Sequence, residues 1–179
     1  MFEAHDIKKY KLYYWDTSRS KESNAMVSGI RTYHLFVSSN LIEEVTLPEL
    51  ETIITHEIGH IKSKHLIKLM IGKIFIISTL ISMIVLPNLI QLDGFNRLLF
   101  YVLIVALVFL GILVSIGVEK KYENEADLYA SLYNDHELFA SALNKITKYE
   151  EVEKNKIDEL FQTHPDIKER IEIIKRGEK

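Results

Sequence analysis

The chain has 179 residues, with 25 acidic and 22 basic side chains, a net charge of -3 and no cysteine. Its length fits one compact domain, and its slight acidity argues against nucleic-acid binding, which requires clustered lysines and arginines. The absence of cysteine excludes disulfides and thiolate metal sites, so histidines and carboxylates would have to hold any bound metal.

The part of the chain before residue 46 predicts a small β-sheet. It opens with scattered charges and no apolar run of signal-peptide length, so we expect this end to stay in the cytoplasm. Residues Leu12–Trp15 and Tyr33–Ser39 are rich in aromatic and β-favouring side chains. If the second of these strands is an exposed edge, an extended substrate could bind beside it. The candidate substrate-binding residues there are Leu35, Phe36 and Val37.

A helix is predicted to begin at Leu47, because Thr46–Glu49 forms a capping box with a proline in the first turn. His56 and His60 lie four residues apart in this helix, so their imidazoles share one face and can bind one metal ion. Glu57, beside them, completes an HExxH motif and is placed to act as a general base on a metal-bound water. The alternative is a pair of histidines on a solvated helix face.

The segment from residue 69 to residue 118 is almost entirely apolar and predicts two membrane spans. Residues 98–118 contain no charge over 21 positions, which matches a bilayer core of roughly 30 Å at about 1.5 Å per residue. Residues 69–92 form a second candidate span, with Lys73 near its start and Pro87 near its end. Two buried helices in the core of a soluble protein are the alternative.

The loops predict that both termini and the active site face the cytoplasm. The positive-inside rule applies because lysines flank the hairpin, whereas its connector contains only Arg97 against Asp93. The flanking lysines are Lys62, Lys64, Lys68, Lys73, Lys120 and Lys121. Continuous helices would hold the metal about 10 to 15 Å from the membrane interface.

A catalytic zinc site needs a third protein ligand. His65 lies five residues after His60 and off its face, which indicates a surface residue or one behind the ligands, and Leu66 occupies the position of the third histidine in the longer zincin motif. Glu123 and Asp127 lie four apart on one helical face. We predict Glu123 as the ligand and Asp127 as the acceptor of a ligand histidine's second ring N–H. Glu125 is the alternative ligand, and an ordinary acidic helix surface is the alternative for the whole segment.

These motifs resemble the family of integral-membrane zinc peptidases that includes HtpX and the CAAX prenyl proteases. The His56–His60 motif followed by His65 looks like the active-site helix of that family. Residues Glu123–Asp127 resemble its ExxxD motif, whose glutamate is the third zinc ligand.

Two further elements are similar to that family. His164-Pro165 with Arg170 resembles its HPxxxxR element, in which the histidine and the arginine are thought to assist the developing oxyanion. By itself, a His-Pro pair is more typical of the turn that starts a helix. Asn24-Ala25 is similar to the strand region that lines the family's substrate groove.

Together these features predict an α+β, mainly helical fold. It would comprise a small N-terminal β-sheet, a zincin-type HExxH helix, a transmembrane helical hairpin and C-terminal cytoplasmic helices. Residues 1–179 would form a single metallopeptidase domain, with the hairpin inserted at about residues 69–118.

The expected function is that of a zinc-dependent endopeptidase with one Zn²⁺ per chain. It would be a two-span protein of the cell membrane, acting at the cytoplasmic face on membrane-associated peptides or proteins and not on nucleic acid. The natural substrate, the cleavage site and the oligomeric state stay open. A metal-binding scaffold without turnover and a membrane subunit with a coincidental HExxH are the competing hypotheses.

Overall fold

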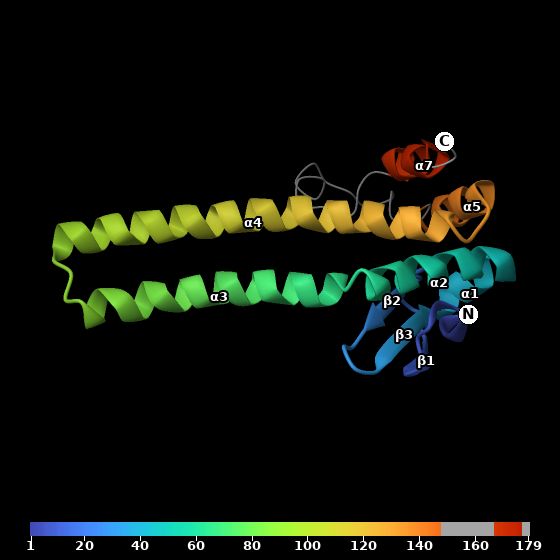
Figure 1. Cartoon of the computed structure of the whole chain (residues 1–179), viewed down its shortest axis with the longest axis horizontal. Coiled ribbons are helices and arrows are strands. Elements are labelled where there is room, and N and C mark those ends of the chain that lie inside the picture. Colours follow the sequence, from blue (N-terminus) through green and yellow to red (C-terminus); the bar gives the residue numbers. More distant parts are fainter. Residues whose placement is uncertain (148–166, 177–179) are drawn as a thin grey trace. The chain divides into compact units, whose positions relative to one another are not determined.

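The computed structural model describes residues 1–147 and 167–176, with helices and strands labelled as in Figure 1. The chain divides into two compact units. The first unit contains Met1–Leu66 and the described residues from Lys120 onward, and the second contains Ile67–Glu119. The second unit begins and ends within two residues of the predicted insertion. That the whole chain works as one metallopeptidase domain stays a prediction.

The first unit contains a three-stranded sheet with the order β1-β3-β2. Strand β3 (Tyr33–Ser38) lies in the centre, parallel to β1 (Tyr10–Trp15) and antiparallel to β2 (Ala25–Ser28). The condition under which a substrate could bind beside the Tyr33 strand, that this strand is an exposed edge, is therefore not met, because its backbone pairs on both sides. In the described part of the chain, the free edges belong to β1 and β2.

The tight turn after β2 explains why a third strand could form there. Gly29 has a φ of 93°, which glycine adopts without steric cost, and an added Cβ would lie 2.2 Å from the carbonyl oxygen of Thr32. The turn returns the chain directly along β2, which places Val27 opposite Leu35 and Met26 opposite Phe36.

The sheet packs against helix α2 (Leu47–Lys62), as Figure 1 shows. A hydrophobic cluster joins them, and each large aliphatic side chain in it contributes about 1.5 to 3 kcal/mol by leaving water. The buried members of this cluster are Phe2, Ile7, Leu35, Ile58 and Ile61. The helix that carries the HExxH motif is thus fixed against the sheet on one face.

The predicted capping box forms at the start of α2. The Thr46 side chain accepts a hydrogen bond from the Glu49 backbone N–H, while Glu49 Oε2 accepts one from the Thr46 backbone N–H at 2.7 Å. The same carboxylate also accepts hydrogen bonds from Ser141 and Lys145 of α5 (His136–Thr147), at 2.7 and 2.6 Å. The cap therefore also ties α5 to α2.

Three further helices of the described residues belong to the first unit. Helix α1 (Ser39–Glu44) follows β3, and the short 3-10 helix η1 (Phe2–His5) begins the chain. Helix α7 (Ile167–Arg176) packs through Ile174 onto Phe139 and Leu143 of α5. The C-terminal helices predicted from the sequence are therefore present.

Helix α2 does not continue into the apolar segment, so the continuous helix assumed in placing the metal relative to the membrane interface is not present on this side. It ends at Lys62, where the Ser63 backbone N–H still bonds to the Gly59 carbonyl oxygen at 3.0 Å. Lys64 then adopts a left-handed conformation with a φ of 56°. That conformation breaks the helical hydrogen-bond pattern, so a new helix begins at His65.

The two long apolar helices are α3 (His65–Leu89) and α4 (Gly94–Ser131). Among the described residues, these two are long and apolar enough to cross a membrane, and none of the residues in their most apolar windows is buried. Exposed apolar surface of this extent contradicts the alternative of core helices in a soluble protein. The mainly helical fold with a small sheet and two long apolar helices is confirmed.

Candidate active site

The two motif histidines face each other from successive turns of α2. Their Nε2 atoms lie 3.1 Å apart, and the ring planes meet at 77°. The four-residue spacing produces this approach, because residues at positions i and i+4 of a helix share one face. His56 is 7% exposed, so its ring is almost fully enclosed.

Glu123 of α4 completes a triangle with these nitrogens. Its Oε1 lies 3.3 Å from His60 Nε2, and its Oε2 lies 3.6 Å from His56 Nε2. Two ligands about 2.0 to 2.1 Å from one tetrahedral zinc ion are separated by about 3.3 Å. The three donor groups thus have the chemistry and the mutual spacing of ligands to a single ion.

Glu57 lies beside the same donors, and its ligand atoms and those of His56 and His60 all lie within 4.8 Å of one another. Its Oε2 accepts a hydrogen bond from the Val27 backbone N–H at 3.0 Å, so the edge strand β2 orients the carboxylate. Burial raises the pKa of Glu57 above its usual value, and the two histidines partly offset that effect. A carboxylate with a raised pKa is suited to accept a proton.

Asp127 and Arg170 form a buried ion pair behind His56. Asp127 Oδ1 lies 2.8 Å from His56 Nδ1, although the ring N–H is not aligned with it as a regular hydrogen bond. Arg170 of α7 donates from Nε and Nη2 to the two oxygens of Asp127, each at 2.7 Å. The family resemblance named Arg170 together with His164, and in the structure the Arg170 guanidinium contacts Asp127. His164 lies outside the described residues.

The charges of the site favour a divalent cation. Within residues 1–147 and 167–176, the carboxylates of Glu57, Glu123 and Asp127 are enclosed with the guanidinium of Arg170, so these four groups carry two negative charges in excess when both histidines are neutral. Burial lowers the pKa of His56, but Asp127 and Glu123 outweigh that effect and raise it to about 9. Without a metal, a histidinium therefore supplies the positive charge that these carboxylates stabilise.

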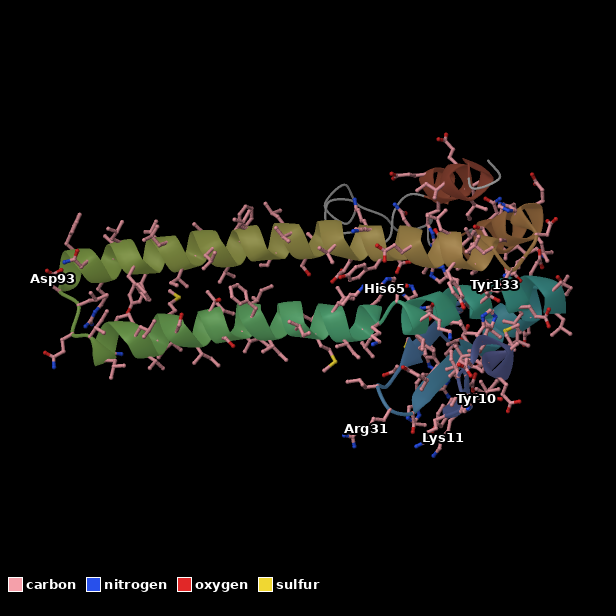
Figure 2. All side chains as sticks on the ribbon, in the orientation of Figure 1. Tyr10, Lys11, Arg31, His65, Asp93 and Tyr133 are labelled. Atoms are coloured by element: carbon pink, nitrogen blue, oxygen red, sulfur yellow. The ribbon has the colours of Figure 1, made fainter. Side chains whose placement is uncertain are left out.

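His65 lies behind His60 and is not a surface residue, because it is only 1% exposed. Figure 2 labels it where α3 begins. Its Nδ1 lies 2.9 Å from His60 Nδ1, and its Nε2 lies 3.0 Å from Glu125 Oε2. Glu125, the alternative ligand, thus contacts His65, while Glu123 contacts the Nε2 atoms of the motif.

The predicted substrate-binding residues divide into two groups. Ala25 begins β2, the edge strand that also contacts Glu57, and Asn24 lies just before that strand. Leu35 is 1% exposed and belongs to the core, so its assignment to substrate binding is wrong. Phe36 stacks on Tyr13 with centroids 4.9 Å apart, and Val37 packs against the hydrophobic core. These three side chains lie on β3, which is the central strand of the sheet and therefore offers no free edge to a substrate.

Sequence reasoning missed Val27, the residue that links the sheet to the site. The local signal for β2 was the short run Ala-Met-Val-Ser followed by Gly29, which supports a strand and a turn. A four-residue strand is too short for its alternation to stand out, so only the pairing with β3 reveals it.

Comparisons with known proteins agree with this arrangement. The model of peptidase family M48 matches residues 1–178. A protease HtpX homolog of Bacteroides fragilis (strain YCH46) is 31% identical over 161 residues, which cover 79% of this chain and 50% of that protein. A protease HtpX homolog of Helicobacter pylori (strain J99) is 28% identical over 183 residues, covering 90% of this chain and 55% of that protein.

A solved structure shares the fold. The crystal structure of S. mikatae Ste24p superposes with a TM-score of 0.69 and 18% identity, over 92% of this chain and 44% of that one. The chain spans about half the length of the curated relatives it matches. The match to the family model extends over nearly the whole chain and includes the HExxH helix and the α4 carboxylates. The chain therefore belongs to peptidase family M48.

Proposed function

We propose that this chain is a zinc-dependent endopeptidase that holds one Zn²⁺ through His56, His60 and Glu123. The observation that carries the proposal is the convergence of two imidazole nitrogens and one carboxylate at 3.1 to 3.6 Å, the spacing of ligands to one ion. Membership of family M48 supports the same chemistry. Three protein ligands leave the fourth position of zinc to water or substrate.

Glu57 is the proposed proton acceptor. Bound zinc would polarise the scissile carbonyl and lower the pKa of a water molecule. A Glu57 oxygen takes the proton of that water as the water attacks, and it then delivers the proton to the departing amine nitrogen. The Val27 N–H holds the carboxylate beside the histidines, so no reorientation is needed when the substrate arrives.

We assign the oxyanion contact to His164, on the basis of the family resemblance. A histidine N–H that donates to the developing negative charge would stabilise the transition state more than the ground state. Arg170 acts indirectly in this proposal, since its guanidinium fixes Asp127, which in turn lies against His56.

The proposed substrate path follows the free edge of β2. Because the Val27 N–H points to Glu57, the Val27 backbone faces away from β3, and so does that of Ala25 two residues earlier. An extended peptide that pairs with the backbone of Ala25 would lie beside the general base, and Asn24, whose own backbone N–H and carbonyl oxygen bond to Ser38, would support that edge from the β3 side. Recognition through backbone hydrogen bonds would make the sequence preference loose.

We further propose that α3 and α4 anchor the chain in the cell membrane and that the site faces the cytoplasm. The two exposed apolar helices and the lysines on both sides of the hairpin support this topology. Membrane-associated proteins or peptides are then the substrate class. A reporter fused after Lys179 should be accessible from the cytoplasm, and its appearance outside the cell would contradict the topology.

The central experiment compares metal content and cleavage in three forms of the full chain purified in mild detergent. Wild type should carry one zinc per chain and cleave an unfolded membrane protein. Glu57→Gln should keep the zinc and lose at least about a hundredfold in rate, as expected for removal of a general base. Glu51→Gln, a change at an exposed carboxylate of the same helix, is the matched control and should behave as wild type.

If zinc-loaded wild type cleaves no faster than Glu57→Gln, the chain is a metal-binding scaffold and not an enzyme. The ligand assignment has its own test, since Glu123→Ala should lose the zinc. Retention of zinc in Glu123→Ala would show that another group is the third ligand.

A further inference from the structure

The second ring nitrogen of His60 contacts an imidazole, whereas that of His56 contacts a carboxylate. His60 Nδ1 lies 2.9 Å from His65 Nδ1, and His65 Nε2 lies 3.0 Å from Glu125 Oε2. The three side chains thus form a continuous line from the Nε2 face of the motif to the acidic residue on α4. Lys121 lies at the far end, 3.7 Å from the other oxygen of Glu125.

Only one arrangement of protons fits this line when His60 binds a metal. A histidine that binds zinc through Nε2 carries its proton on Nδ1, so His60 Nδ1 must donate. His65 Nδ1 must then accept with its lone pair, which puts the proton of a neutral His65 on Nε2. That Nε2–H points at an acceptor, the carboxylate of Glu125. Each contact has one donor and one acceptor.

We propose that His65 and Glu125 are positioning residues that orient His60 and fix its metal-binding tautomer through this line of hydrogen bonds. The inference rests on the proposed zinc site. It gives Glu125 a function distinct from that of Glu123, because Glu125 acts through two imidazoles and does not touch the ion. Partners of this kind, behind a metal ligand, hold its ring in place and increase its basicity.

The helix break after α2 explains how His65 reaches this position. In a continuous helix, a residue five positions after His60 would lie about 140° around the axis, with its side chain directed away from the His60 ring. The left-handed conformation of Lys64 redirects the chain at this point. The His65 ring then stacks on Tyr122 with centroids 4.2 Å apart and planes 5° apart. A buried, stacked ring is a rigid support for a ligand.

The test compares zinc affinity among variants of the full chain in detergent, by competition with a chromophoric chelator. His65→Phe keeps a ring that can stack on Tyr122 but removes both nitrogens, and we expect zinc to bind about 10- to 100-fold more weakly. His65→Gln supplies an oxygen that accepts and an amide that donates, so it should recover most of that loss. Glu125→Ala should weaken zinc binding, and Lys121→Met should leave it unchanged.

A second readout separates positioning from general stability. With Co²⁺ in place of zinc, the visible absorption bands report ligand geometry, and they should shift in His65→Phe but match wild type in His65→Gln. Thermal unfolding of the metal-free protein should be the same for Lys121→Met and wild type. If His65→Phe does not fold, the comparison of Glu125→Ala with wild type decides the question.

The outcomes separate this inference from the proposed function. The positioning role alone would be overturned if folded His65→Phe, or Glu125→Ala, bound zinc with the affinity of wild type and gave an unchanged Co²⁺ spectrum. Failure of wild type to bind one zinc per chain would overturn the zinc site and this inference with it. Loss of zinc in Glu125→Ala as complete as in Glu123→Ala would identify Glu125 as a ligand and refute the line of hydrogen bonds.

Discussion

The buried ion pair between Asp127 and Arg170 provides a quantitative test of how the site is held together. Asp127→Asn preserves the shape of the side chain but removes the negative charge that Arg170 contacts through Nε and Nη2 at 2.7 Å. The side chains are 0% and 10% exposed, so water cannot replace the lost carboxylate. The guanidinium would stay buried without its counter-charge.

The cost follows from that burial. Removing one partner of a buried ion pair costs about 3 to 5 kcal/mol, against about 0 to 1 kcal/mol for an exposed pair. We expect about 3 kcal/mol for Asp127→Asn, since the amide oxygen still accepts one hydrogen bond, and a similar loss for Arg170→Met. In the double variant both partners of this ion pair are absent, so no guanidinium is left buried without its carboxylate. Its cost should fall below the sum of the single changes by about 2 kcal/mol or more.

The assay is denaturant unfolding of the metal-free full chain in mild detergent, followed by tryptophan fluorescence. Trp15 is the only tryptophan and lies at the end of β1, so its signal reports the first unit. Lys121→Met is the control, because Lys121 is 72% exposed in its pair with Glu125 and should contribute little. Single changes that each cost less than about 1 kcal/mol, or a strictly additive double variant, would refute the reasoning.

Two further predictions concern the attachment of α2. Burial raises the pKa of Glu49, but hydrogen bonds, the strongest from Lys145, outweigh it and lower the pKa from 4.5 to about 2. The ionised carboxylate therefore stabilises the fold above pH 4.5, and this contribution disappears as the pH falls towards 2. Glu49→Gln should cost about 1 to 2 kcal/mol at pH 7, allowing for the partly exposed lysine, and should flatten the acid-unfolding curve; an unchanged curve would contradict this. Gly59→Ala places a Cβ 3.1 Å from the Ala126 Cα, so it should push α2 and α4 apart and weaken zinc binding. Gly117→Ala, whose Cβ would meet no atom within 4 Å, is the control and should bind zinc as wild type does. Equal zinc affinities in the two variants would contradict this prediction.

The sequence predicted the features that depend on local patterns. The capping box at Thr46 and the start of α2 at Leu47 were confirmed, because both depend on residues within one helical turn. The two long apolar helices were also predictable, since their composition alone distinguishes them from their flanks. The meeting of Glu123 with the two motif histidines was predicted from chemistry, namely the need for a third ligand.

The features that depend on contacts between distant residues could not be read from the sequence. Whether β3 lies at the edge or in the centre depends on a pairing with β2, whose four residues carry no distinctive pattern. Arg170 meets Asp127 across 43 positions of the chain, and the sequence contains several other carboxylates that could have been its partner. The end of α2 depends on one residue, Lys64, whose type seldom adopts the left-handed conformation.

One turn of α4 determines most of the site. Glu123 faces the Nε2 atoms of the motif, Asp127 lies against the other nitrogen of His56, and Glu125 contacts the imidazole behind His60. A shift of this helix by one residue rotates it by about 100°, which would move all three carboxylates away from their partners at once. The position of the helix is held where the Ala126 Cα meets Gly59, with no space for a side chain between them. A bulky residue at either of these two positions should therefore disturb the metal ligand and both supporting carboxylates together, whereas a substitution of one carboxylate removes only the contacts of that side chain.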